Sequence, residues 1–96
     1  MDLNQRTVTM IMHEGWGEEF AFQTEDNHAY YFKSDDQEVK IIKDYEERGC
    51  FIVEGRELGQ EDWLDWDIVD YEEAEAMVAT AEVRERKMKK EQEFTM

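Results

Sequence analysis

A run of 27 residues without a basic side chain constrains this chain more than any other feature. Between Arg56 and Arg84 the sequence holds ten Asp and Glu residues and no Lys or Arg. Its central part, residues 61–75, holds eight of these carboxylates together with six large apolar or aromatic residues, namely Trp63, Leu64, Trp66, Ile68, Val69 and Tyr71. High acidity is typical of a solvated tail, whereas aromatic side chains are typical of a core or an interface. The combination predicts a folded segment in which apolar residues anchor the chain and carboxylates are displayed in a fixed arrangement.

The composition predicts that residues 1–96 form a single acidic domain. Leu, Ile, Val and Phe number only 19 of 96, and the formal net charge is −15. Those values lie near the border between folded and intrinsically disordered chains, but six Met, four Tyr and three Trp favour a folded core. The charge is uneven, because residues 84–96 hold five basic and three acidic side chains. We expect residues 84–96 to form a basic helix end that projects from the domain.

The net charge also narrows the classes of partner. Carboxylates repel phosphates, so direct binding to nucleic acid or to an anionic membrane is not expected. A basic protein surface is the expected partner, above all one that handles nucleic acid. The first residues have no basic segment followed by an apolar run, and no stretch is apolar enough to cross a membrane. Cys50 is the only cysteine. We therefore expect a cytoplasmic protein without disulfides.

Hydrophobic periodicity predicts an α+β fold with an antiparallel sheet of about five strands. Alternating apolar residues indicate strands at about residues 7–13, 19–24, 28–33, 50–54 and 63–69. The sequence Ser34-Asp35-Asp36-Gln37 fits a helix capping box, which predicts a short helix at about residues 35–48. The alternative is a strand at residues 37–42, which would complete a small five- or six-stranded barrel. An apolar stripe from Ala74 predicts a C-terminal helix at about residues 72–93.

Catalytic, cofactor and metal motifs are not recognisable in the sequence. Gly15 and Gly17 are not followed by the helix and lysine of a phosphate-binding loop, and one Cys with two distant His residues makes no zinc motif. Asp65, Asp67 and Asp70 resemble part of a calcium loop but are not accompanied by its central glycine and final Glu. We therefore expect a binding protein without a cofactor, a metal or a catalytic residue.

The candidate partner-binding residues lie in two acidic groups. Asp65 and Asp67 would stand roughly 6.5–7 Å apart on one face of a strand. Trp63 would be either an exposed anchor for a partner or a half-buried cover over the sheet. The first group extends from the strand into the start of the C-terminal helix and comprises Asp62, Trp63, Asp65, Asp67, Asp70, Glu72 and Glu73. The second group lies on the expected short helix and comprises Asp35, Asp36 and Glu38, continued by Asp44, Glu46 and Glu47.

In size, acidity and expected α+β fold the chain resembles the small inhibitors that bacteriophages produce against host defences, such as anti-CRISPR proteins and DNA-mimic inhibitors. The resemblance rests on the whole chain and on no residue motif, so it transfers no functional residue. It implies a protein that acts in the host cytoplasm and occupies the basic groove of a nucleic-acid-handling protein. The alternative is a structural or adaptor protein that docks through the helix at residues 72–93, as a monomer or a homo-oligomer.

Overall fold

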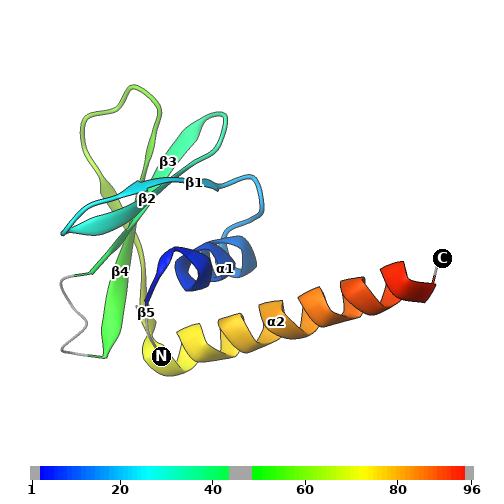
Figure 1. The fold of residues 1–96 in the computed structure, drawn as a ribbon. Coiled ribbons are helices and arrows are strands. Elements are labelled where there is room, and N and C mark those ends of the chain that lie inside the picture. The colour runs from blue at the N-terminus through cyan, green and yellow to red at the C-terminus, as the bar shows by residue number, and fades with distance from the viewer. Residues whose placement is uncertain (1–2, 44–48, 95–96) are drawn as a thin grey trace.

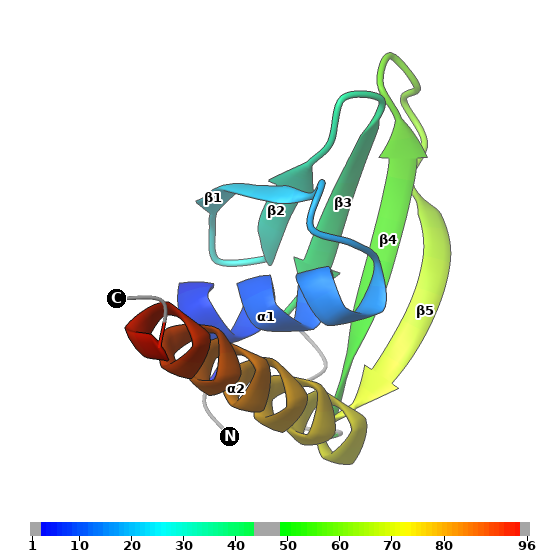
Figure 2. The ribbon, with the colours of Figure 1, turned by 90° about the vertical axis from the view of Figure 1, so that its right-hand side faces the viewer.

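The computed structural model describes residues 3–43 and 49–94, the last seven of them for their backbone only. It has an α+β fold in which five antiparallel strands are joined in sequence order, β1-β2-β3-β4-β5. Both helices lie on one face of this sheet (Figures 1 and 2). The elements are α1 (Gln5–Gly15), β1 (Ala21–Glu25), β2 (Ala29–Lys33), β3 (Gln37–Ile42), β4 (Cys50–Glu57), β5 (Leu64–Asp70) and α2 (Tyr71–Phe94).

The expected first strand, residues 7–13, is wrong, because this segment belongs to helix α1. Asn4 is the N-cap, and its side chain accepts a hydrogen bond from the backbone N–H of Thr7 at 3.0 Å. The Thr7 hydroxyl in turn accepts one from the backbone N–H of Asn4, also at 3.0 Å. Val8, Ile11 and Met12 are fully buried and lie at helical spacing. The short helix of the fold is therefore N-terminal.

The expected helix at residues 35–48 is also wrong over its described part, because residues 37–42 form strand β3. Ser34 does accept a hydrogen bond from the backbone N–H of Gln37, at 3.2 Å, but within a tight turn between β2 and β3. The alternative of a strand at residues 37–42 is thus confirmed. Residues 44–48 of the expected helix, with Asp44, Glu46 and Glu47, lie outside the described residues.

The strands expected at residues 19–24, 28–33, 50–54 and 63–69 are confirmed with shifted ends, and so is the C-terminal helix. The sheet is open, because the strand order leaves β1 and β5 at its two edges. Over the described residues it is therefore an open sheet and not the closed barrel that a strand at residues 37–42 was expected to complete. Two edges of a sheet remain available for contact with other molecules.

The hydrophobic core lies between the sheet and the two helices. Phe32, Phe51 and Val53 from the sheet are at most 1% exposed, and they face fully buried residues of α1. Each such side chain contributes roughly 1.5–3 kcal/mol when it is removed from water. Helix α2 adds Ala74 and Val78 to the same core. No helix in the described part of the chain is long and apolar enough to cross a membrane.

Candidate functional site

Strand β5 carries the main group of candidate binding residues along an edge of the sheet. All five carboxylates from this strand and the first turn of α2 are exposed, namely Asp65, Asp67, Asp70, Glu72 and Glu73. None of them forms an ion pair with any cation that the structure describes. The nearest basic residues in sequence, Arg56 and Arg84, both have carboxylate partners elsewhere. This edge therefore carries negative charge that the described part of the protein does not neutralise.

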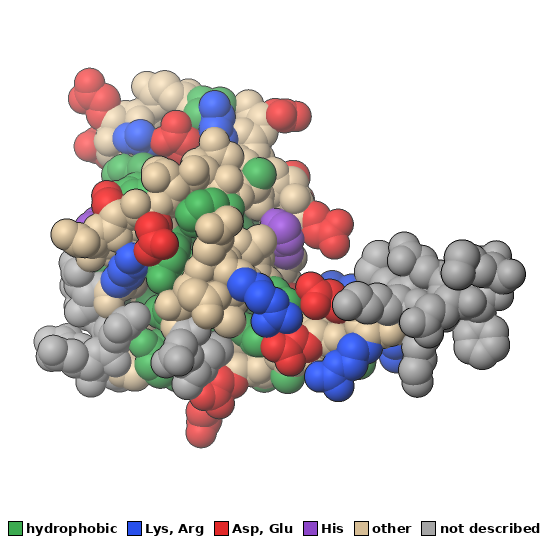
Figure 3. Space-filling model, viewed as in Figure 1, with side chains coloured by type: hydrophobic (Ala, Val, Ile, Leu, Met, Phe, Trp, Pro, Cys, Tyr) green, Lys and Arg blue, Asp and Glu red, His purple; other side chains and the backbone are tan. Residues whose placement is uncertain are grey.

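The cations of the described segments are concentrated on other parts of the molecule. Arg84 pairs with Glu14, and Arg6 lies within 3.6 Å of both Glu82 and Glu85, so ion pairs join α1 to α2. In Figure 3, Lys and Arg side chains accordingly lie among Asp and Glu side chains along α2. The remaining pairs are Lys40–Glu54, Lys43–Glu25, Arg56–Glu38 and Arg86–Glu82. These cations are already engaged, and the two described cations without an ion pair, Lys33 and Lys87, lie on β2 and α2. A partner must therefore supply the positive charge that faces β5.

A β-bulge in β5 changes the expected arrangement of its aspartates. Asp65 pairs with Glu54 and Asp67 pairs with Val53, so β5 contains one more residue than β4 at this point. Glu54 and Val53 are neighbours and point to opposite faces of the sheet. The expectation that Asp65 and Asp67 share one face is therefore wrong. Each face of the edge strand displays one of the two carboxylates.

Two of these aspartates also organise the backbone around them. A carboxylate oxygen of Asp67 accepts the backbone N–H of Ile68 at 2.8 Å. Asp70 accepts the backbone N–H of Glu73 at 2.8 Å, in the manner of a helix N-cap. Glu72 and Glu73 occupy the first turn of α2, where negative charge is favoured by the helix dipole. The carboxylates at the end of β5 therefore have defined positions.

Apolar side chains stand between the acidic ones on the same strand. Leu64 is 60% exposed and Ile68 is 64% exposed, the two highest values among the large hydrophobic side chains that the structure describes. Ile68 pairs with Ile52, and Ile52 pairs with Ile42, so a row of Ile residues crosses three strands. The sequence pattern did not mark Ile68 as a surface residue, because the bulge between Asp65 and Asp67 leaves no signal in a short apolar run. Leu64 was not marked either, because it belongs to the same apolar run.

The second acidic group does not lie on a helix and does not join the first. Asp35 and Asp36 are exposed in the turn between β2 and β3, and the Asp36 carbonyl accepts the N–H of Leu58 at 3.0 Å. Asp62 is exposed in the connection between β4 and β5. Glu38 is engaged on the sheet, where one carboxylate oxygen contacts Arg56 at 2.8 and 2.9 Å. The predicted binding residues are therefore spread along the sheet and are not gathered in one patch.

Trp63 is half-buried and covers charged side chains of the sheet. Its ring lies 4.5 Å from the Lys40 ammonium and 4.3 Å from the Arg56 guanidinium. These cation–π contacts are on the face of the sheet turned away from the helices, which we call the outer face. Lys40 there pairs with Glu54 at 3.4 Å. Of the two roles expected for Trp63, the geometry matches a cover over the sheet.

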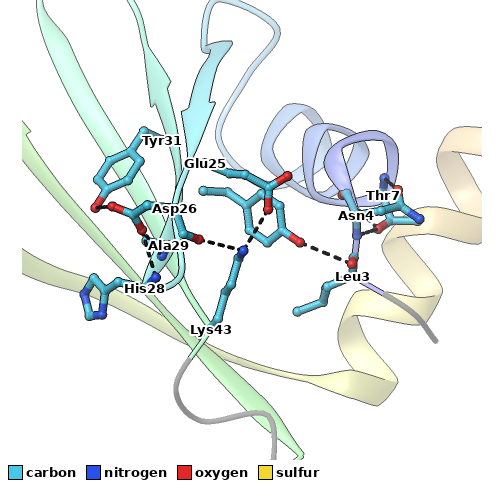
Figure 4. A network of polar contacts seen from close by, with 10 residues as sticks. Leu3, Asn4, Thr7, Glu25, Asp26, His28, Ala29, Tyr31 and Lys43 are labelled. Carbon is cyan, nitrogen blue, oxygen red and sulfur yellow. Dashed lines mark hydrogen bonds and ion pairs between the residues drawn. The ribbon is translucent and has the colours of Figure 1, made fainter.

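Asp26 is the centre of a polar network in the turn between β1 and β2 (Figure 4). Its carboxylate accepts the backbone N–H groups of Ala29 and His28 at 2.8 Å and the Tyr31 hydroxyl at 2.9 Å. These bonds, above all that from Ala29, lower the pKa of Asp26 below its ordinary value of 3.8. The hydrogen bond to Glu25 raises the pKa of Lys43. The network fixes the turn and orients Tyr31.

The described residues contain no group of three or more His, Cys, Asp or Glu side chains that could hold a metal ion. No protein-family model matches the chain, and neither the curated proteins nor the solved structures include a match. The candidate site is therefore defined by its own geometry, as an edge strand with unpaired carboxylates and exposed aliphatic side chains.

Proposed function

We propose that this protein binds a basic surface of a nucleic-acid-handling protein through the edge strand β5 and thereby inhibits it. The observation that carries the proposal is the set of exposed carboxylates from Asp65 to Glu73, which have no cationic partner among the described residues. A groove that binds nucleic acid presents Lys and Arg side chains to a row of phosphates. A row of carboxylates held on a strand and a helix end offers those same side chains an alternative partner.

The exposed aliphatic side chains of β5 support contact with a protein more than with free cations. Leu64 and Ile68 would be desolvated in the interface, where well-packed apolar contacts supply much of the affinity. Charge on the rim mainly speeds association and selects the partner. The proposed interface is formed by side chains. Addition of a partner strand is less favoured, because Asp67 already satisfies the N–H of Ile68 and the bulge interrupts the ladder. The proposal gives the protein no catalytic role.

The proposal is tested by capturing partners from a nuclease-treated bacterial lysate with three baits. The first bait is the unchanged protein and the second carries Asp65→Asn and Asp67→Asn. The third carries Glu18→Gln and Glu19→Gln, which removes the same charge from exposed positions in the turn after α1. Asn preserves an oxygen that can accept the N–H of Ile68, so the second bait keeps this local hydrogen bond.

The expected result is a nucleic-acid-binding protein that the first and third baits retain and the second bait loses. It should elute at moderate salt and be displaced by added DNA or RNA, because both compete for the same basic groove. Equal retention by the second and third baits would refute the role of β5. A partner that nucleic acid does not displace would refute the mimicry.

A second candidate function, that of an adaptor or assembly protein, is favoured by the projecting helix α2. This helix extends beyond α1 (Figure 1), and Val83 on it is 49% exposed. Beyond Ala81, its described side-chain contacts with α1 are the ion pairs of Glu82, Arg84 and Glu85. If this end mediates assembly, a chain that stops before Arg84 remains folded but loses self-association in analytical ultracentrifugation. A full-length protein that is monomeric at high concentration contradicts self-assembly.

A further inference from the structure

The outer face of the sheet has a cleft over strands β1, β2 and β3. Trp63 forms its wall on the side of strand β5. This open cleft has a volume of about 290 Å³, near the lower end of the range for small-molecule sites. Two aromatic side chains, Trp63 and Tyr31, form part of its wall. The remaining lining residues are Gln23, Thr24, Phe32, Lys33 and Glu38. A cleft of this size with two aromatic walls suits a single flat ring system.

Both aromatic walls are held in place before any ligand arrives. The Tyr31 hydroxyl donates to Asp26 at 2.9 Å, and Asp26 is itself fixed by two backbone N–H groups. Trp63 rests on Lys40 and Arg56. Arg56 is in turn oriented by Glu38 at 2.8 Å and by the Glu61 carbonyl at 3.3 Å. Side chains that are already ordered lose little entropy when a ligand binds, which favours affinity.

The unbalanced charge at the cleft is positive, in contrast to the net charge of the whole chain. Lys33 lines the cleft, is exposed, and has no ion-pair partner among the described residues. Glu38 is the only carboxylate in the lining, and Arg56 neutralises it. Lys40, beneath Trp63, is neutralised by Glu54. A ligand at this position therefore meets one free ammonium group and no free carboxylate from the lining.

We infer that this cleft is a binding site for a small aromatic anion, with its ring against Tyr31 and Trp63 and its negative group at Lys33. Gln23 and Thr24 provide polar groups at the rim. A cationic ring is disfavoured, because the lining offers it the free ammonium group of Lys33 and no free carboxylate. The site is separate from the β5 carboxylates, so it stands whether or not these bind a basic partner.

Paired probes test the inference by nuclear magnetic resonance titration of the ¹⁵N-labelled full chain. Indole-3-acetate and tryptamine share a ring and differ in charge, and N-acetyl-tryptophanamide is a neutral mimic of a partner's Trp side chain. Indole-3-acetate should shift the signals of Gln23, Thr24, Lys33 and the Trp63 indole N–H. It should bind roughly thirtyfold more tightly than tryptamine, because one charge about 4 Å away changes the affinity about fivefold in water, upward for the anion and downward for the cation.

Two charge reversals supply the matched control. Lys33→Glu should reverse the preference, so that tryptamine binds more tightly than indole-3-acetate. Lys87→Glu changes the net charge equally at an exposed position on α2, and it should leave the preference unchanged. Trp63→Ala should abolish the shifts. If that variant does not fold, Tyr31→Leu removes the other wall and serves the same purpose.

Three outcomes would overturn the inference. The first is the absence of localised shifts with indole-3-acetate at millimolar concentration. The second is tryptamine binding as tightly as indole-3-acetate to the unchanged protein, or a preference that Lys33→Glu does not alter. The third is tighter binding of N-acetyl-tryptophanamide, which would make the cleft a socket for an aromatic side chain of a partner protein.

Discussion

Gly55 shows how one residue can set the geometry of the binding edge. It lies within β4, and a Cβ atom at this position would overlap the ring of Trp66. Trp66 in turn packs edge-on against Phe20, with ring centroids 6.3 Å apart. The absence of a side chain at position 55 therefore lets the bulged part of β5 bring its tryptophan close to the sheet.

Gly55→Ala should consequently destabilise the protein by about 1–3 kcal/mol, the usual cost of overpacking a filled space. Urea unfolding followed by circular dichroism measures this effect. Combining the substitution with Trp66→Leu should recover part of the loss, because a smaller side chain makes room for the new methyl group. A Gly55→Ala variant as stable as the unchanged protein would contradict the close approach of Trp66.

Asp26 provides a pH-dependent prediction at the same scale. Hydrogen bonds from Ala29 and His28 lower its pKa in the folded state, so the folded protein favours the carboxylate more than the unfolded chain does. The stabilising effect is present above the ordinary pKa of 3.8 and is lost as the pH falls through the lower folded-state value. Asp26→Asn should therefore lower the melting temperature at pH 7, and the difference should shrink towards pH 3. Thermal melts of both proteins between pH 7 and pH 3 test this prediction. A difference in melting temperature that stays constant over that range contradicts it.

At the scale of elements, α1 depends on its cap as well as on its buried stripe. Asn4 and Thr7 exchange two hydrogen bonds at its start. Asn4→Ala removes the side-chain acceptor and should cost about 1 kcal/mol. Asn4→Asp keeps an acceptor and should cost less. Chemical denaturation of the two variants separates them. An equal loss of stability in Asn4→Ala and Asn4→Asp would show that the side-chain hydrogen bond is not what stabilises the helix.

The two segments whose secondary structure was predicted incorrectly share one local hydrogen-bond pattern. A polar side chain that bonds a backbone N–H three residues later occurs both at helix starts and in turns. Asn4 makes this bond at a helix start, where alternating apolar residues had suggested a strand. Ser34 makes it in a hairpin turn, where the same signal had suggested a helix. Tertiary packing decides between the two outcomes, since Val8 and Ile11 meet the sheet and Val39 and Ile41 belong to it.

The elements with longer or clearer patterns were predictable from the sequence. The C-terminal helix and four strands follow from their apolar periodicity. The acidic character of β5 is likewise visible in the sequence, although the orientation and exposure of its individual side chains are not. The bulge that moves Asp67 to the other face and exposes Ile68 arises from pairing with β4, a contact between segments that are separate in the chain. The cleft at Tyr31 and Lys33 is likewise formed by segments that are separate in the chain.

At the scale of the whole molecule, the net charge of −15 should oppose folding by self-repulsion. Added salt screens this repulsion, so the melting temperature should rise between low ionic strength and about 0.15 M, where the screening length is about 8 Å. Differential scanning calorimetry with sodium chloride and, as a check on specific ion effects, potassium chloride tests this. A melting temperature that falls with both salts would mean that the ion pairs outweigh the repulsion.

At β5, removing carboxylates should affect binding and stability in different ways. Carboxylates without cationic partners contribute repulsion, so Asp65→Asn with Asp67→Asn should leave the free energy of unfolding unchanged or slightly higher. Edge strands also use charge to prevent aggregation. If protection of the edge is the main role of these aspartates, the double variant will aggregate in light-scattering measurements. If binding is the main role, it will stay monodisperse and lose affinity.

The central claim is that the β5 carboxylates bind a basic partner, and the most direct test is the affinity of the captured partner for matched variants. Calorimetric titration would compare Asp65→Asn with Asp67→Asn against Glu18→Gln with Glu19→Gln at two salt concentrations. We predict that the β5 variant binds about tenfold more weakly, or about 1.4 kcal/mol, with a shallower salt dependence, while the control binds as the unchanged protein does. Equal affinities for the two variants would contradict the claim.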